Sequence, residues 1–289
     1  MPIKESELIL NPDGSIYHLN LKPENVSKTI IFVGDQDRVD TVSKRFDSIE
    51  FKTQKREFKT HTGTYKGKRI SVISTGIGPD NIDIVLNELD ALFNIDFTTR
   101  QVKEKLTSLD IIRIGTSGSL QKDIPVDAFA LSTYGLDING MLHAYKVGDI
   151  SHSDIENAFI EQTNWHSNKA RPILIKGSKK LEQKFTSNKT HKGITATAGG
   201  FYGPQGRVLR LAIQDVNLNS KMDDFNFNGH RIANFEMETS AIYGLSKLLG
   251  HHALSLNAII ANRASGTFSK NPQNVIENLI TYTLNKIIE

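Results

Sequence analysis

Five apolar runs, each followed closely by glycine, limit the possible folds of this chain more than any other feature. They are KTIIFVGD (28–35), KRISVISTGIG (68–78), LDIIRIGTSG (109–118), KGITATAGG (192–200) and LNAIIANRASG (256–266). Strands that read as almost continuous apolar runs are buried on both faces. The runs therefore predict an α/β protein with a largely parallel sheet and covered faces. Residues 127–136 and 171–177 are further strand candidates.

Three helices are predicted where apolar residues recur every three to four positions, in residues 81–93, 236–250 and 272–288. The last opens with Asn271 as a helix cap and Pro272 in the first turn. No internal repeat or Pro/Ser-rich linker divides the chain. We expect a single domain over residues 1–289, with the polar segment 94–108 as a possible surface insertion.

Composition and charge exclude several classes of function. The formal net charge of +3 is too weak for a nucleic-acid-binding surface, and cysteine is absent, so disulfides and thiolate metal sites are excluded. The N-terminus lacks a signal-peptide pattern, and no apolar run approaches the roughly 18 residues of a membrane-spanning helix. We expect a cytoplasmic protein without nucleic-acid or membrane partners.

Arginine is scarce in this chain, but it gathers where strands are expected to end. Lysines outnumber arginines 24 to 11, yet arginine occupies four such places: Arg38, Arg113, Arg207 and Arg263. Ligands of open α/β proteins bind beyond the carboxyl ends of the strands, and a guanidinium suits phosphate, carboxylate or a heterocycle edge. A single strand-end arginine is more often part of a structural salt bridge. Four of them favour a shared site for an anion or a base.

Two glycine-containing motifs could hold one phosphate. VGDQDR supplies Gly34, whose backbone can approach a ligand closely, and Arg38 one turn into an expected helix. RIGTSG supplies Arg113 and the hydroxyl of Thr116. The alternative is a pair of ordinary strand-to-helix turns. STGIGPDN is not a dinucleotide motif, because Asn81 stands at the third glycine position.

The motif NFEMETS (234–240) is expected to begin a helix, with Glu236 and Glu238 on either side of Met237. One interpretation is a solvated acidic first turn, which suits the helix dipole. The other places Glu238 on the vicinal hydroxyls of a sugar, where a carboxylate accepts two hydrogen bonds and can stabilise nearby positive charge. Met237 would then pack on the face of the sugar.

The stretch TATAGGFYGPQGR (195–207) is the most unusual loop. A pyrimidine edge presents carbonyl, N–H and carbonyl groups, which the amide of Gln205 and the guanidinium of Arg207 can together satisfy. Phe201 could lie near the sugar or the base, and the preceding glycines would leave the loop free to move. A polar surface hairpin is the alternative.

Seven short motifs follow one another along almost the whole chain, in the order GDxxR, REF, STGIG, RIGTSG, FYGPQGR, EMET and NR. Together they resemble the uridine phosphorylase branch of the nucleoside phosphorylase-I family. The resemblance implies an α/β fold with a central mixed, partly barrel-like sheet flanked by helices. It also implies reversible phosphorolysis of uridine to uracil and ribose 1-phosphate. Alternatives are a purine nucleoside phosphorylase or nucleosidase of the same fold, and a non-catalytic nucleoside-binding or storage protein.

The resemblance implies a role for individual residues. A phosphate site would comprise Gly34, Arg38, Arg56, Arg113 and Thr116, with Arg56 contributed by a neighbouring subunit. The nucleoside would be held by His18 (also from the neighbour), Phe201, Gln205, Arg207, Met237 and Glu238. Arg263, Arg207, Gln205 and Glu238 would act in catalysis, the first three on the leaving uracil.

The same resemblance bears on partners and cofactors. Shared sites imply a homodimer or a higher oligomer of dimers. Phosphate is a co-substrate, and no cofactor or metal ion is expected. A monovalent-cation site would use Glu57 and a serine, but Asn81 stands where the serine would be.

Overall fold

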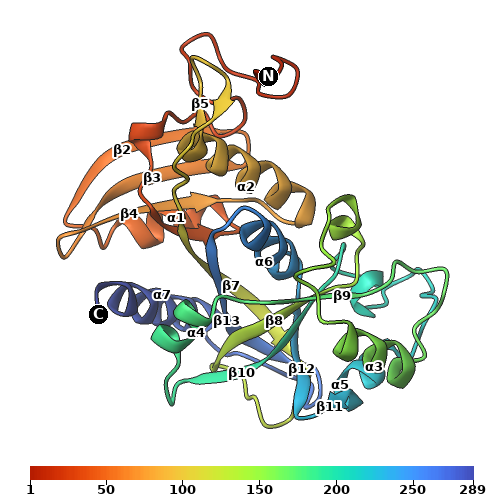
Figure 1. Cartoon of the computed structure of the whole chain (residues 1–289). Coiled ribbons are helices and arrows are strands. Elements are labelled where there is room, and N and C mark those ends of the chain that lie inside the picture. Colours follow the sequence, from red (N-terminus) through yellow and green to blue (C-terminus); the bar gives the residue numbers. More distant parts are fainter.

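The computed structural model describes residues 1–289 as a single α/β domain (Figure 1). Its helices are α1 (Gln36–Ser43), α2 (Pro79–Asn94), α3 (Ser153–Thr163), α4 (Lys179–Phe185), α5 (Leu218–Asp224), α6 (Thr239–Leu248) and α7 (Pro272–Ile288). Its main strands are β1 (Thr29–Val33), β2 (Ser48–Lys55), β3 (Phe58–Tyr65), β4 (Lys68–Ser74), β7 (Asp110–Ser119), β8 (Phe129–Asp137), β9 (Ile173–Lys176), β10 (Thr190–Thr197), β12 (His230–Glu236) and β13 (His252–Asn262). Short strands are β5 (Ile95–Asp96), β6 (Gln101–Val102), β11 (Asn226–Phe227) and β14 (Thr267–Phe268).

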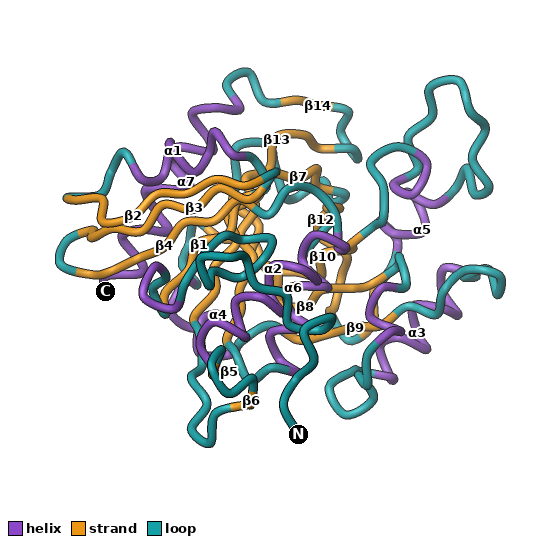
Figure 2. The backbone as a smooth tube through the Cα atoms, turned by 90° about the horizontal axis from the view of Figure 1, so that it is seen from above, coloured by secondary structure: helices purple, strands orange, loops and turns teal.

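One large mixed sheet forms the centre of the molecule. Its strand order is β11-β12-β10-β8-β13-β7-β1-β4-β3-β2, and an additional pairing joins β12 to β7. This pairing closes the ring β7-β12-β10-β8-β13, while β1 to β4 extend the sheet away from the ring (Figures 1 and 2). The expected mixed, partly barrel-like sheet is therefore confirmed.

Helices cover both faces of the extended part of the sheet. Alternate residues of β1 point to opposite faces, so Ile30 and Phe32 join a core with α2 and α6, whereas Ile31 and Val33 join a core with α1, α4 and α7. A third core lies between the outer face of the ring and helices α3 and α5. All five glycine-terminated runs of the sequence are strands, as predicted.

The inner face of the ring is largely polar. A chain of hydrogen bonds joins Ser132 on β8, Thr195 on β10, Asn234 on β12 and Ser117 on β7, and all four residues are buried. Buried polar groups are tolerated when they are hydrogen-bonded to one another. The ring thus brings polar side chains from four strands to one place, next to the carboxyl ends of β7 and β12.

Two local predictions were wrong. The strand does not end at Arg113: β7 continues through both glycines of RIGTSG to Ser119, because Gly118 and Ser119 pair with β12 and Gly115 pairs with β13. Glu236 does not begin a helix but ends β12, and α6 starts at Thr239 with Glu238 as its cap residue. The motif NFEMETS is therefore a strand end joined to a helix start.

The other predicted elements are present. Residues 81–93 lie within α2, 127–136 overlap β8, and 171–177 contain β9. Asn271 caps α7, since its side chain accepts a hydrogen bond from the backbone of Asn274 at 3.2 Å. The segment 94–108 contains the hairpin of β5 and β6, which contacts the N-terminal segment through Arg100 and Ile3.

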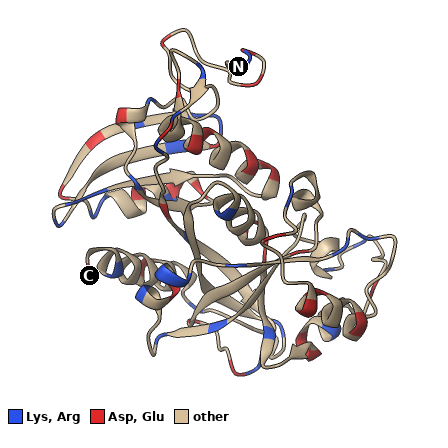
Figure 3. Ribbon diagram, in the orientation of Figure 1, with Lys and Arg blue, Asp and Glu red and all other residues tan.

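Charged residues of both signs are mixed over the whole molecule (Figure 3). Lys and Arg do not gather on one face of the ribbon, in keeping with the small net charge. None of the helices combines the length and the apolar character needed to cross a bilayer.

Candidate active site

A cavity of about 880 Å³ lies at the carboxyl ends of β1, β7, β12 and β13. Nine of the twelve predicted site residues line it: Gly34, Arg38, Arg113, Thr116, Phe201, Gln205, Arg207, Met237 and Glu238. They come from the turn after β1 and the first turn of α1, from β7, from the loop after β10 and from the β12–α6 connection. The structure thus brings together segments that span more than 200 positions of the chain.

Arg38 and Arg113 form one pair of cations at the cavity. Arg38 is held by the carbonyl of Ile114, which accepts from its Nη1 at 3.2 Å. Burial, and next the charge of Arg113, lower the pKa of Arg38. Two guanidinium groups that repel each other in a shared cavity form a site that an anion would stabilise.

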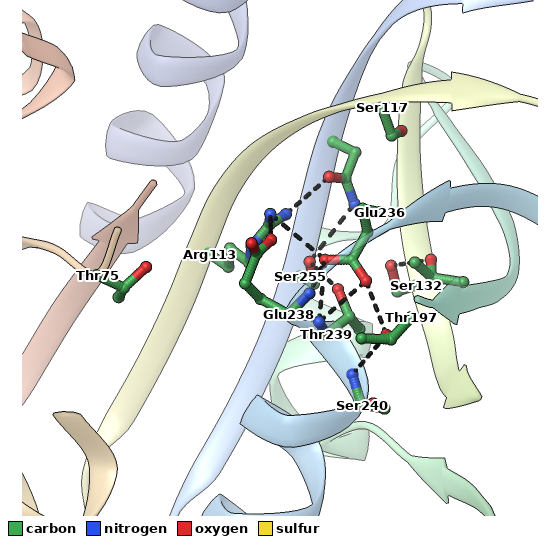
Figure 4. A network of polar contacts seen from close by, with 12 residues as sticks. Thr75, Arg113, Ser117, Ser132, Thr197, Glu236, Glu238, Thr239, Ser240 and Ser255 are labelled. Carbon is green, nitrogen blue, oxygen red and sulfur yellow. Dashed lines mark hydrogen bonds and ion pairs between the residues drawn. The ribbon is translucent and has the colours of Figure 1, made fainter. Parts of the chain in front are cut away.

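Two carboxylates neutralise Arg113 from the side of the ring (Figure 4). Its Nη2 donates to Glu238 and lies 3.3 Å from Oε2 of Glu236. Burial alone would lower the pKa of Arg113, but Glu238 and Glu236 raise it above its ordinary value. The arginine is therefore charged, and it holds Glu238 at the cavity wall.

Glu238 itself is nearly inaccessible to solvent, at 4% exposed, which rules out the solvated acidic turn. It accepts hydrogen bonds from Arg113 and, at 2.8 Å, from the backbone N–H of Gly78. Burial raises the pKa of Glu238, and the neighbouring Glu236 acts in the same direction, since two carboxylates here share one arginine. A carboxylate in this setting can accept further hydrogen bonds from hydroxyl groups of a ligand.

Glu236 has a structural role that sequence reasoning missed. Its carboxylate accepts from the backbone of Glu238 at 2.9 Å, from the backbone of Thr239 and from the hydroxyl of Thr197 at 2.8 Å (Figure 4). It therefore shapes the turn that carries Met237 and Glu238. The only feature of the sequence that points to this role is the position of Glu236 two residues before Glu238.

Gln205 and Arg207 form the polar part of the loop after β10. Nη1 of Arg207 donates to Oε1 of Gln205 and to the carbonyl of Phe201, both at 2.6 Å. The Arg207 guanidinium also stacks on the Phe201 ring, 3.8 Å from its centre. Because Oε1 of Gln205 already accepts from Arg207, the amide Nε2 is the part of this buried side chain that is left to donate.

Arg263 lies beside the cavity and behind Gly118. A Cβ built on Gly118 would lie 3.6 Å from Cγ and Cδ of Arg263, and the guanidinium faces the Phe235 ring at 5.8 Å. Its Nη1 is buried and has no hydrogen-bond partner. Burial and the charge of Arg207 lower its pKa to about 10. Arg207 and Arg263 are thus a second pair of neighbouring cations.

Two predicted residues do not line this cavity. Arg56 sits at the β2–β3 turn with φ of 53°, and its carbonyl accepts from Gln36 at 2.7 Å. His18 belongs to the N-terminal segment, and its Nδ1 contacts Glu88 on α2 at 2.6 Å. Neither residue lines the cavity of its own chain.

Glu57 and Asn81 do line the cavity, and both lie close to Gly76. A Cβ on Gly76 would lie 2.5 Å from Nδ2 of Asn81 and 3.1 Å from Cγ of Glu57. Across the chain, no three His, Asp or Glu side chains are grouped closely enough to hold a metal ion.

Comparison with known proteins identifies the family. The model of the phosphorylase superfamily matches residues 28–285. A uridine phosphorylase of Thermococcus kodakarensis is 29% identical over 259 residues, 89% of this chain and 81% of its own. A DeoD-type purine nucleoside phosphorylase of Geobacillus stearothermophilus is 26% identical over 275 residues, 94% of this chain and 98% of its own.

A solved structure gives the same result. The Trypanosoma brucei nucleoside phosphorylase, described as showing uridine phosphorylase activity, superposes with a TM-score of 0.87 at 29% identity, over 97% of this chain and 99% of its own. The chain belongs to the phosphorylase superfamily, as an enzyme of its nucleoside phosphorylase-I family.

Proposed function

We propose that the protein catalyses the reversible phosphorolysis of uridine to uracil and ribose 1-phosphate. The observation that carries the proposal is the pairing of cations at one cavity: Arg38 and Arg113 both line it, and Arg207 lines it next to Arg263, which lies beside it. One pair is expected to bind the phosphate and the other the uracil carbonyls. Relatives of this chain with uridine phosphorylase names or activity support the choice of base.

The reaction needs no nucleophilic side chain. Phosphate, held by Arg38, Arg113 and the hydroxyl of Thr116, would attack C1′ of the ribose. As the C1′–O bond forms, the C1′–N1 bond breaks, and its electron pair leaves with the uracil, which then takes up a proton from solvent. Positive charge develops on the sugar during this step, as in glycoside cleavage.

The remaining cavity residues would stabilise that transition state. Glu238 would accept hydrogen bonds from the ribose hydroxyls and oppose the positive charge on the sugar, with Met237 packed on the ribose. Gln205, Arg207 and Arg263 would donate to the uracil carbonyls as they become negative. One such donor typically lowers a barrier by about 3 kcal/mol. Inorganic phosphate is the co-substrate, and we propose no other cofactor.

The proposal includes a homo-oligomer with shared sites. His18 and Arg56 do not line the cavity of their own chain, which is consistent with a role in the site of a neighbour. We propose a homodimer or an oligomer of dimers in which Arg56 reaches the partner's phosphate and His18 reaches the partner's ribose.

A purine nucleoside is the second candidate substrate, because DeoD-type purine nucleoside phosphorylases align over 94% of this chain. The test is the release of free base from uridine and from inosine, each with and without phosphate, followed by ultraviolet absorbance. Phosphate-dependent cleavage of uridine over inosine is expected. Preference for inosine would identify a purine enzyme, and cleavage without phosphate would identify a nucleosidase.

A further inference from the structure

Asn257 holds the end of Arg113 that the carboxylates do not reach. Oδ1 of Asn257 accepts from Nη1 of Arg113 at 2.8 Å, while Nη2 of the same arginine faces Glu238 and Glu236. Asn257 lies in the middle of β13 and is fully buried. Its own amide nitrogen has only a long contact, 3.5 Å, with Ser255 Oγ. Its strongest interaction is therefore with the arginine.

The ring places this amide where the guanidinium needs an acceptor. In the ladder between β7 and β13, Asn257 lies directly opposite Gly115. The Arg113 side chain folds back over that glycine, so that a Cβ at position 115 would lie 1.9 Å from Nη1 of Arg113 and 2.5 Å from Oδ1 of Asn257. Gly115 thus leaves the space in which the two side chains meet.

We propose that Asn257 is a positioning residue for Arg113, and that it sets the affinity of the enzyme for phosphate. This inference rests on the proposed function, in which Arg113 binds the phosphate. Without Asn257, only Glu238 and Glu236 would hold the guanidinium, and both lie on one side of it. The amide secures the other nitrogen without adding a third negative charge beside an anion.

The first test replaces Asn257 by alanine. The dissociation constant for inorganic phosphate, measured by calorimetry without nucleoside, is expected to rise roughly tenfold, as for loss of a hydrogen bond to a charged group. The KM for phosphate should rise in parallel, while the KM for uridine stays within about twofold. A general structural defect would alter both substrates alike.

Two further variants keep the test decisive if Asn257→Ala does not fold. Asn257→Asp retains the acceptor atom but adds a charge, so weaker phosphate binding is expected with uridine KM little changed. Gly115→Ala drives a methyl group between Arg113 and Asn257 and should reproduce the effect of Asn257→Ala.

The matched control is Asn94→Ala, which removes a buried asparagine that bonds Thr107 far from the cavity. Asn94→Ala should lower stability and leave both KM values unchanged.

The inference is overturned if phosphate affinity stays within about twofold of wild type in the folded variants, or if uridine KM rises as much as phosphate KM. The proposed function fails separately, if wild-type protein cleaves no nucleoside in the presence of phosphate. Calorimetry would still decide the role of Asn257 in that case, because it needs no turnover. A wild-type protein that binds no phosphate would overturn both.

Discussion

The guanidinium of Arg263 is placed where a charged group is unfavourable. It is half buried, one of its nitrogens is buried without a partner, and the neighbouring charge that acts on its pKa is another cation, Arg207. A pKa lowered to about 10 means that the fold disfavours the charged form. A residue kept at a cost to stability is a sign that the site requires it.

Replacing Arg263 by methionine is therefore expected to change stability and activity in opposite directions. Methionine fills a similar volume without a buried charge, so the melting temperature should rise by about 2–4 °C, which corresponds to roughly 1 kcal/mol in a chain of this size. Uridine turnover should fall at least a hundredfold, as for loss of a donor to developing negative charge. Differential scanning fluorimetry and the ultraviolet assay measure the two effects. A variant with full activity would remove Arg263 from the proposed mechanism.

Single residues also show how far the sequence could predict the site. The sequence alone singled out the arginines at the strand ends and Gln205, two residues before Arg207. These residues line one cavity or lie beside it. Nothing in the sequence pointed to a role for Asn257, because this residue lies inside an apolar run and acts only through a partner 144 positions away. Its role depends on the register of β7 against β13, which no local pattern encodes.

Among the elements, β7 was the most misleading. Glycines close to an arginine indicated a strand end, but here Gly115 serves close approach, because a Cβ at this position would clash with the Arg113 side chain. Strand and helix periodicity predicted the elements that pack against large cores. It could not predict the closure of the ring, because the β7–β12 pairing involves only two pairs of residues.

The loop 199–217 is the most exposed element of the site. Val208, Leu209, Arg210 and Leu211 are all exposed, although Gln205 at the base of the loop is buried. The loop also borders a second, mainly apolar cavity of about 850 Å³, and Arg207 lines both cavities. Binding at Gln205 and Arg207 should therefore restrict the motion of the whole loop.

Limited proteolysis tests this coupling. Trypsin is expected to cut first after Arg210, because an exposed loop offers an accessible and deformable backbone. Uracil together with phosphate should slow that cut several-fold, whereas cuts elsewhere in the chain keep their rate. Mass spectrometry of the fragments identifies the site, and equal rates with and without ligands would show that the loop does not respond to occupancy.

For the whole molecule, the proposed oligomer can be tested by mixing two inactive variants. This test shows whether sites are shared between subunits, which a measurement of molecular mass does not. Arg56→Ala and Arg207→Ala should each be nearly inactive, because every site would need Arg207 from its own chain and Arg56 from its neighbour. Mixing and exchanging subunits of the two variants should restore about one quarter of wild-type activity, since half of the random dimers contain one intact site. No recovery, in spite of proven subunit exchange, would mean that Arg56 does not act across an interface.

The acid side of the stability curve should depend on His61. This residue is buried on β3, contacts Ser43 at 2.8 Å, and has a pKa lowered chiefly by burial and next by Lys52, although Asp40 opposes the shift. The unfolded chain then takes up a proton near the ordinary value of 6.5, whereas the folded chain resists it. Stability contributed by neutral His61 is present above pH 6.5 and is lost as the pH falls below it.

His61→Gln should therefore flatten the loss of melting temperature between pH 7 and pH 5. Differential scanning fluorimetry over this range measures the slope, and His166→Gln serves as the control for loss of an exposed imidazole. An unchanged slope in His61→Gln would assign the acid sensitivity to other groups.

The closed ring has a consequence for how this enzyme comes into being. Arg113 and Glu238 stand 125 positions apart and meet only once β12 has paired with β7, on opposite sides of the closure. A nascent chain released before β12 would contain α1 to α5 but neither Glu238 nor the strand that closes the ring, and it is expected to be inactive. Activity should consequently appear in a single late step of synthesis, when the ring closes. Incomplete chains should therefore be inactive rather than active with poor selectivity.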